Sequence, residues 1–221
     1  MRERVLRVHR PGCVPYAEAW AAQRRLAARV LGARSEGHLI LLEHPPVFTL
    51  GRNAKPANVL LSAEELQRRG IAVEKTDRGG DVTYHGPGQV VGYLVLHLPT
   101  WHLGVAEFVH GLESAMARAC AAFGVPARAG ATAIGAWTGE RKVGSVGIHV
   151  SRGITTHGFA LNACPDLAAF ALINPCGMPG CPMTSLEAES GKRVTWEAAA
   201  GAMEREVLEL LGPDVTEGAK I

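Results

Sequence analysis

The spacing of apolar residues along the chain predicts several helices. Apolar side chains recur every three or four positions over residues 105–123, which makes this the clearest helical pattern in the sequence. A serine followed three residues later by a glutamate, Ser62 and Glu65, forms a capping box that starts another helix. With Thr195 as a second N-cap, the further predicted helices span residues 16–31, 62–69, 165–171 and 196–211.

Short apolar runs bounded by turn residues predict the strands. They span residues 38–43, 47–50, 71–76, 90–98, 134–137, 141–150 and 154–162. Because helices and strands do not alternate strictly as β-α-β units, we expect an α+β or mixed α/β fold. No repeat or long linker divides the chain, so we expect a single domain over residues 1–221, with its core at about 38–211 and a frayed tail at 212–221.

The composition is that of a globular protein, with 47% hydrophobic and 20% charged residues. No apolar run approaches the ~18 residues that span a bilayer, and the N-terminus lacks the apolar segment of a signal peptide. We therefore expect a cytoplasmic protein without a membrane partner. The net charge of +2 is too small to indicate a nucleic-acid partner, although arginines crowd the N-terminal part, where they form a solvated face or meet an acidic protein.

The stretch from Arg78 to Leu98 joins a polar, glycine-rich segment to an apolar run. Glycines let the backbone fold tightly around a small ligand, and the apolar run predicts a buried strand that holds the segment rigidly. The same pattern is typical of a tight hairpin, so both interpretations stay open on local chemistry. It contains neither of the common phosphate-binding glycine motifs.

Cys176 is the strongest candidate nucleophile, because it lies in a loop bounded by proline and glycine at residues 174–182. A catalytic thiol needs a nearby base or cation. Strict alternation along residues 141–150 places Lys142 on the aliphatic face, where burial favours the neutral amine that accepts a proton. The other candidate bases are His85, His149 and His157.

The rival use of Cys176 is metal binding. Cys181 follows at a spacing that zinc sites permit, and two histidines would complete a tetrahedral set. No second Cys or His pair with ligand spacing occurs elsewhere, so we expect a site without a metal and without a cofactor.

Four long motifs resemble the lipoyl(octanoyl) transferase family. They are EHPPVFTLGR at 43–52, RGGDVTYHGPGQ at 78–89, RKVGSVGIHVSRGITTHGFALN at 141–162, and INPCGMPG followed by MTSL at 173–186. The resemblance implies a fold similar to lipoate–protein ligases and the biotin protein ligase catalytic domain. It also implies transfer of an octanoyl group from octanoyl-acyl carrier protein, through a cysteine thioester, to a lysine of lipoyl domains. Those acceptors are the lipoyl domains of 2-oxoacid dehydrogenase complexes and the glycine cleavage H protein.

The resemblance further implies a catalytic dyad of Cys176 and Lys142. It assigns substrate binding to two groups of residues along the matching motifs. They are Arg78, Gly79, Gly80, Tyr84, His85 and Gly86 in the first, and Ser145, Val146, Gly147, His157, Gly158, Phe159 and Ala160 in the second. The alternatives are an ATP-dependent lipoate or biotin ligase of the same fold, and a non-catalytic or zinc-stabilised binding module.

Overall fold

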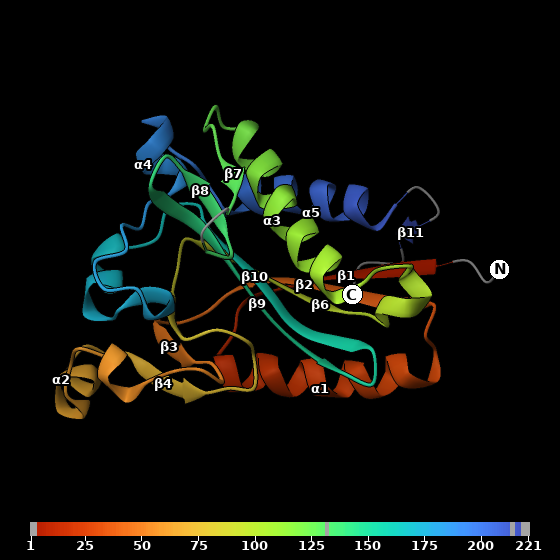
Figure 1. The fold of residues 1–221 in the computed structure, drawn as a ribbon, viewed down its shortest axis with the longest axis horizontal. Helices are drawn as coiled ribbons and strands as arrows, with labels where there is room; N and C mark the ends of the chain where they lie inside the picture. Colours follow the sequence, from red (N-terminus) through yellow and green to blue (C-terminus); the bar gives the residue numbers. More distant parts are fainter. Residues whose placement is uncertain (1–3, 131–132, 213–214, 218–221) are drawn as a thin grey trace.

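The computed structural model describes residues 4–130, 133–212 and 215–217, and a large mixed sheet lies at its centre (Figure 1). The strands of this sheet follow the order β11-β1-β2-β6-β10-β9-β8-β7. In that order they are Val215–Glu217, Arg4–Cys13, Glu36–Glu43, Gln89–Val95, Ile154–Asn162, Arg141–Ser151, Ala136–Thr138 and Arg128–Ala129. β1 runs parallel to β11 and β2, whereas β2, β6, β10, β9, β8 and β7 pair antiparallel.

A small second sheet lies beside the first and carries the glycine-rich motif. Its order is β4-β3-β5, formed by Ala72–Lys75, Val47–Leu50 and Val82–His85. β3 pairs parallel to β4 and antiparallel to β5. The motif therefore includes a strand at Val82–His85, where the sequence pattern indicated only a polar turn.

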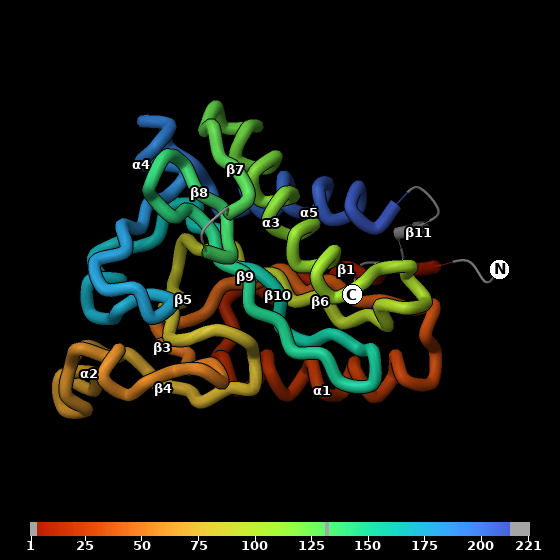
Figure 2. The backbone as a smooth tube through the Cα atoms, viewed as in Figure 1, coloured from red at the N-terminus to blue at the C-terminus, as the bar shows by residue number. Residues whose placement is uncertain are grey.

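Helices cover both faces of the large sheet. α1 (Tyr16–Gly32) lies along one face, and α3 (Val105–Ala121) and α5 (Trp196–Leu211) lie together on the other, as the backbone trace shows (Figure 2). The remaining helices are short: α2 (Ala63–Arg68), α4 (Leu186–Ser190), and the 3-10 turns η1 (Pro56–Asn58), η2 (Leu98–Trp101), η3 (Leu167–Leu172) and η4 (Pro175–Gly177). Within the described residues, no helix has the length and apolar character needed to cross a membrane.

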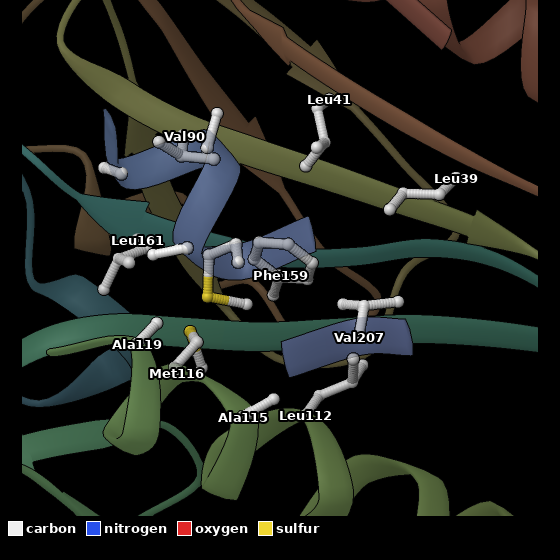
Figure 3. Packing of buried hydrophobic residues seen from close by; sticks show 14 of the residues in the cluster. Leu39, Leu41, Val90, Leu112, Ala115, Met116, Ala119, Phe159, Leu161 and Val207 are labelled. Carbon is white, nitrogen blue, oxygen red and sulfur yellow. The ribbon is translucent and has the colours of Figure 1, made fainter. Parts of the chain in front are cut away.

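The central strands are apolar on both sides because both sides are covered. Leu39 and Leu41 of β2 face the cluster formed with α3 and α5, in which Met116 and Val207 are fully buried (Figure 3). Their neighbours Ile40 and Leu42 face α1, where they pack with Tyr16, Ala19, Val91 and Tyr93. The mixed α/β class expected from the sequence is confirmed.

The capping signals were reliable guides to the helices. The Ser62 and Thr195 side chains accept hydrogen bonds from the backbone N–H groups of Glu65 and Ala198, both at 3.3 Å. Helix α5 has the predicted bounds, and α1 and α3 differ from theirs by no more than two residues. The segment at 165–171 instead forms the 3-10 turn η3.

The ordered structure extends beyond both ends of the predicted core. Leu6 and Val8 of β1 are 0% and 1% exposed, so a strand that the sequence pattern missed belongs to the core. At the other end, Val215–Glu217 pair with β1 and are not frayed. The rest of the expected tail, residues 213–214 and 218–221, lies outside the described residues.

A bulge at the start of β9 changes which way its side chains point. Ala136 pairs with Gly144 but the next residue, Trp137, pairs with Lys142, so Val143 is an extra residue in the ladder. Val143 joins the main apolar cluster, against which Val146 also packs. The strict alternation expected for this strand is therefore wrong at its first residues, since a bulge shifts the register by one.

Gly92 gives a direct test of the packing between β6 and β10. A methyl group added there would lie 2.1 Å from the ring of Phe159, which is only 3% exposed and has little room to move. We expect Gly92→Ala to lower the free energy of unfolding by about 1–3 kcal/mol in urea denaturation. Gly32→Ala, where nothing lies within 4 Å, is the control and should change it by less than about 0.5 kcal/mol. Equal effects of the two variants would contradict this packing.

Candidate active site

A cavity opens where the small sheet meets β9 and β10 of the large sheet. We call it the central cavity. Its volume, measured as the space open to the centre of a water molecule, is about 50 Å³. Of the predicted site residues, it is lined by Arg78, Gly79, Gly80, His85, Ser145, Val146, Gly147, His157, Gly158, Phe159, Ala160 and Cys176. Segments that lie far apart in the sequence therefore come together around the same cavity.

Two predicted binding residues, Tyr84 and Gly86, lie away from the central cavity. Tyr84 packs edge-on against Phe48 and Phe170 in a separate apolar cluster. The reason is the alternation of β5, which turns Thr83 and His85 toward the cavity and Tyr84 to the opposite face. Gly86 follows the strand, and a methyl group added there would lie 2.0 Å from the Tyr84 hydroxyl. Both residues are removed from the predicted lining.

Cys176 lines the central cavity and has an unusual backbone conformation. It has φ 57° and ψ 23°, in the left-handed region, and Gly177 follows with φ 70°. An L-residue other than glycine, asparagine or aspartate seldom adopts this conformation, and it persists only where the surroundings enforce it. The thiol is half-buried and is therefore accessible from the cavity.

Lys142 is the immediate partner of this thiol. Its side chain is 1% exposed, and Nζ donates a hydrogen bond to the Cys176 Sγ at 3.0 Å. The lysine backbone is held as well, because its N–H donates to the Pro182 carbonyl at 2.8 Å and its carbonyl accepts from the Thr184 N–H at 2.9 Å. An amine in hydrogen-bond contact with a thiol is arranged for proton transfer between them.

Arg78 holds the wall of the cavity from within. Its guanidinium is 7% exposed and donates to the Thr49 carbonyl at 2.5 Å, to the Thr49 hydroxyl, and to the Gly79 carbonyl at 2.9 Å. A buried guanidinium with several acceptors fixes the backbone around it. The structure thus gives Arg78 a role in shaping the glycine-rich segment, in addition to lining the cavity.

The sequence pattern missed part of the lining. The missed residues are Tyr16, Asp81, Val82, Thr83, Val91 and Tyr93. Asp81, Val82 and Thr83 were within a motif already identified, and period-two alternation in β5 was the signal that favours Thr83 over Tyr84. Tyr16 offered no such signal, because it reaches the cavity only through the packing of α1 on the sheet.

Burial holds His157, which lines the central cavity, and His44, which is bonded to the lining residue Tyr93, in the neutral form. His157 Nε2 donates to Asp77 at 2.7 Å while Nδ1 accepts from the Tyr16 hydroxyl at 3.2 Å. Burial outweighs the nearby carboxylate and lowers the pKa of His157 to about 4. His44 donates to the Val14 carbonyl and accepts from the Tyr93 hydroxyl, both at 2.6 Å, and burial lowers its pKa to about 4.

The remaining candidate bases have partners other than the thiol. His85 Nδ1 donates to Gln89 at 2.6 Å, and burial holds the pKa of His85 well below its usual range. His149 lies 3.8 Å from the carboxylate of Asp77. Among the described residues, no three His, Cys, Asp or Glu side chains are grouped so as to hold a metal ion.

This geometry can be compared with that of known proteins. Residues 15–208 match the family described as the lipoyl protein ligase A/B catalytic domain. The chain belongs to this family. An octanoyltransferase from Acidobacterium capsulatum is 46% identical over 198 residues, covering 84% of this chain and 80% of the relative.

Solved structures of the lipoyl protein ligase A/B family and its neighbours confirm the expected fold. A lipoate-protein ligase A bound with ATP superposes with a TM-score of 0.75 at 15% identity, covering 100% of this chain and 90% of that one. The biotin protein ligase from Aquifex aeolicus gives 0.51 at 11% identity, covering 95% and 70%. At these identities the likeness concerns the fold alone.

The buried histidines predict a loss of stability in mild acid. In the unfolded chain these histidines take up a proton near their ordinary pKa of 6.5. In the folded chain the pKa of His44 and of His157 is about 4, so both rings stay neutral to lower pH. Stability is therefore fully present above about pH 6.5 and falls as the pH is lowered toward 4. We expect the free energy of unfolding to fall by about 1.4 kcal/mol per pH unit for each of His44 and His157.

Urea denaturation between pH 7 and 5 measures this slope. His44→Gln should reduce the slope by the share of one histidine. A free energy that stays level between pH 6.5 and 5 would contradict the neutral state of the buried rings.

Proposed function

We propose that this protein transfers an octanoyl group from octanoyl-acyl carrier protein to a specific lysine of lipoyl domains. The observation that carries the proposal is the contact of Lys142 Nζ with Cys176 Sγ at 3.0 Å. It lies beside a cavity, in a chain 46% identical to an octanoyltransferase. The acceptors in this proposal are the lipoyl domains of 2-oxoacid dehydrogenase complexes and the glycine cleavage H protein, and the site of action is the cytoplasm.

The first step forms an acyl-enzyme. Lys142, neutral at the moment of attack, takes the thiol proton of Cys176, and the thiolate attacks the thioester carbonyl of the donor. The carbon–sulfur bond to the carrier breaks, and the carrier thiolate receives the proton from Lys142. One thioester replaces another, so the step is nearly balanced in free energy.

The second step passes the acyl group to the acceptor. The lysine amine of the lipoyl domain attacks the Cys176 thioester, Lys142 takes a proton from the nitrogen, and Cys176 leaves as a thiol. An amide forms at the expense of a thioester, which is downhill, so the reaction needs no ATP. The absence of a phosphate-binding glycine motif in the sequence agrees with this expectation.

The lining of the central cavity suits an alkyl chain. Gly147, Gly158, Phe159 and Ala160 provide apolar or side-chain-free surface along β9 and β10. Burial of the methylenes at ~0.8 kcal/mol each supplies roughly 5–6 kcal/mol for an eight-carbon group. This is enough to hold the acyl chain while the thioester is formed and consumed.

An octanoyl adduct on Cys176 is the first prediction of this mechanism. Incubation with octanoyl-acyl carrier protein, without ATP, should give a covalent adduct by intact mass measurement. Cys176→Ala should form none, and Cys181→Ala, in the same loop, should form it as the unchanged protein does. An adduct that survives Cys176→Ala, or activity that requires ATP, would favour the ligase alternative.

Removal of the amine is the second prediction. Lys142→Met keeps the length and the apolar stem of a side chain that is 1% exposed, so the fold should persist while acyl transfer falls about 10²–10⁴-fold. Lys192→Met, at an exposed position, is the control for loss of a positive charge. An unchanged rate in Lys142→Met would transfer the role of base to His85 or His157.

A further inference from the structure

The loop that carries Cys176 is also held by polar side chains that the mechanism above does not use. Asn58, the last residue of η1, is half-buried and makes contacts in two directions. Its Nδ2 donates to Asp81 Oδ2 at 2.9 Å, and its Oδ1 accepts from Asn174 Nδ2 at 3.2 Å. We call Asn58, Asp81 and Asn174 the asparagine clasp.

The clasp joins the two segments that meet at the thiol. Asp81 belongs to the glycine-rich motif and lines the central cavity together with Cys176. Asn174 stands two residues before Cys176, and its backbone N–H donates to the Asn58 carbonyl at 2.8 Å. Because Asn58 bonds to both segments, it fixes the position of one relative to the other.

Backbone contacts extend this fastening along the chain. The Leu60 N–H donates to the Leu172 carbonyl at 2.9 Å, and Val59 pairs with Ile173 in an antiparallel bridge. Residues 58–60 therefore lie alongside residues 172–174, and we call residues 58–60 the strap. The side chain of Asn58 lies at the end of this strap, nearest to the nucleophile.

The clasp also bears on the strained turn itself. A methyl group at Gly177 would lie 2.7 Å from Asp81 Oδ2, so the carboxylate sits directly against the turn. The other oxygen of Asp81 accepts from the Val82 N–H at 2.6 Å, which fixes the carboxylate in place. Cys176 keeps its left-handed conformation only while such neighbours hold it.

We propose that Asn58 is a positioning residue for the Cys176 thiol, keeping Sγ within reach of Lys142 by tying the nucleophile loop to Asp81. The proposal rests on the proposed acyl transfer for its purpose, but the geometry it describes exists without any substrate. Loss of the clasp lets the turn relax, and a displacement of about 1 Å at a reacting atom lowers rates by up to about 10²-fold.

Exchange of the two polar residues provides a sharp test. Asn58→Asp places a second carboxylate against Asp81 and removes the donor, so the clasp opens. The double variant Asn58→Asp with Asp81→Asn restores the donor from the other side and keeps an acceptor for Asn174 and for Val82. Asn53→Asp adds the same charge at an exposed position of the same connection and serves as the control.

The first measurement is the rate at which iodoacetamide alkylates Cys176, followed by mass mapping. We expect Asn58→Asp to slow alkylation about 10-fold or more. The alkylation rate of the double variant should recover to within about 3-fold of that of the unchanged protein. Asn53→Asp should be alkylated at the rate of the unchanged protein. Asn58→Ala removes both side-chain hydrogen bonds without adding charge, so its alkylation should be slowed as much as that of Asn58→Asp. It provides the test if Asn58→Asp folds poorly.

The second measurement is acyl-enzyme formation from octanoyl-acyl carrier protein. Its maximal rate should fall in Asn58→Ala with little change in the donor concentration at half-maximal rate. Alkylation of Asn58→Ala at the unchanged rate, or a double variant as slow as Asn58→Asp, would overturn the positioning role. Clasp-dependent alkylation in a protein that forms no octanoyl adduct would keep the positioning role and reject the proposed function.

Discussion

A lysine amine that is shut away from water needs a polar partner, and the candidate active site is arranged around this need. Lys142 is 1% exposed, and the Sγ of Cys176 supplies the contact at 3.0 Å. The bulge at Val143 turns the lysine out of the apolar face, and the ring of Trp137 lies 5.3 Å from Nζ. The lysine and the nucleophile loop therefore define one another's position, and neither site residue has this geometry alone.

The charged side chains Arg78 and Asp81 line the central cavity, and both have partners within the protein. His157, which lines the cavity, and His44, which is bonded to the lining residue Tyr93, are neutral because burial disfavours the proton and outweighs the hydrogen bonds that favour it. Asp77 accepts a hydrogen bond from His157. The charged groups and histidines named here therefore already have partners within the protein.

The sequence predicted correctly those helices and strands that are specified by signals within the element itself. The α5 helix had both a cap at Thr195 and a regular apolar stripe, and its bounds were predicted. β1 was missed because only Leu6 and Val8 are buried, and the charged residues Arg4, Arg7 and Arg10 beside them obscure the pattern; Arg7 pairs with Glu36 across the sheet. Cys176 and Lys142 were candidates from their positions in a loop and a strand, and the motif resemblance paired them, whereas their 3.0 Å contact depends on a bulge and a loop that no local pattern specifies.

One residue of β10 keeps its place beside β9 but turns its N–H toward a helix instead of β6. His157 has φ 59°. Its N–H donates to the side-chain oxygen of Gln23 in α1 at 2.7 Å, and not to a carbonyl of β6. Regular pairing with β6 begins only at the next residue, Gly158. The cavity is thus not a property of the sheet that could be transplanted by copying strands and loops. A designer who wished to build it into another α/β scaffold would have to carry over the first helix too.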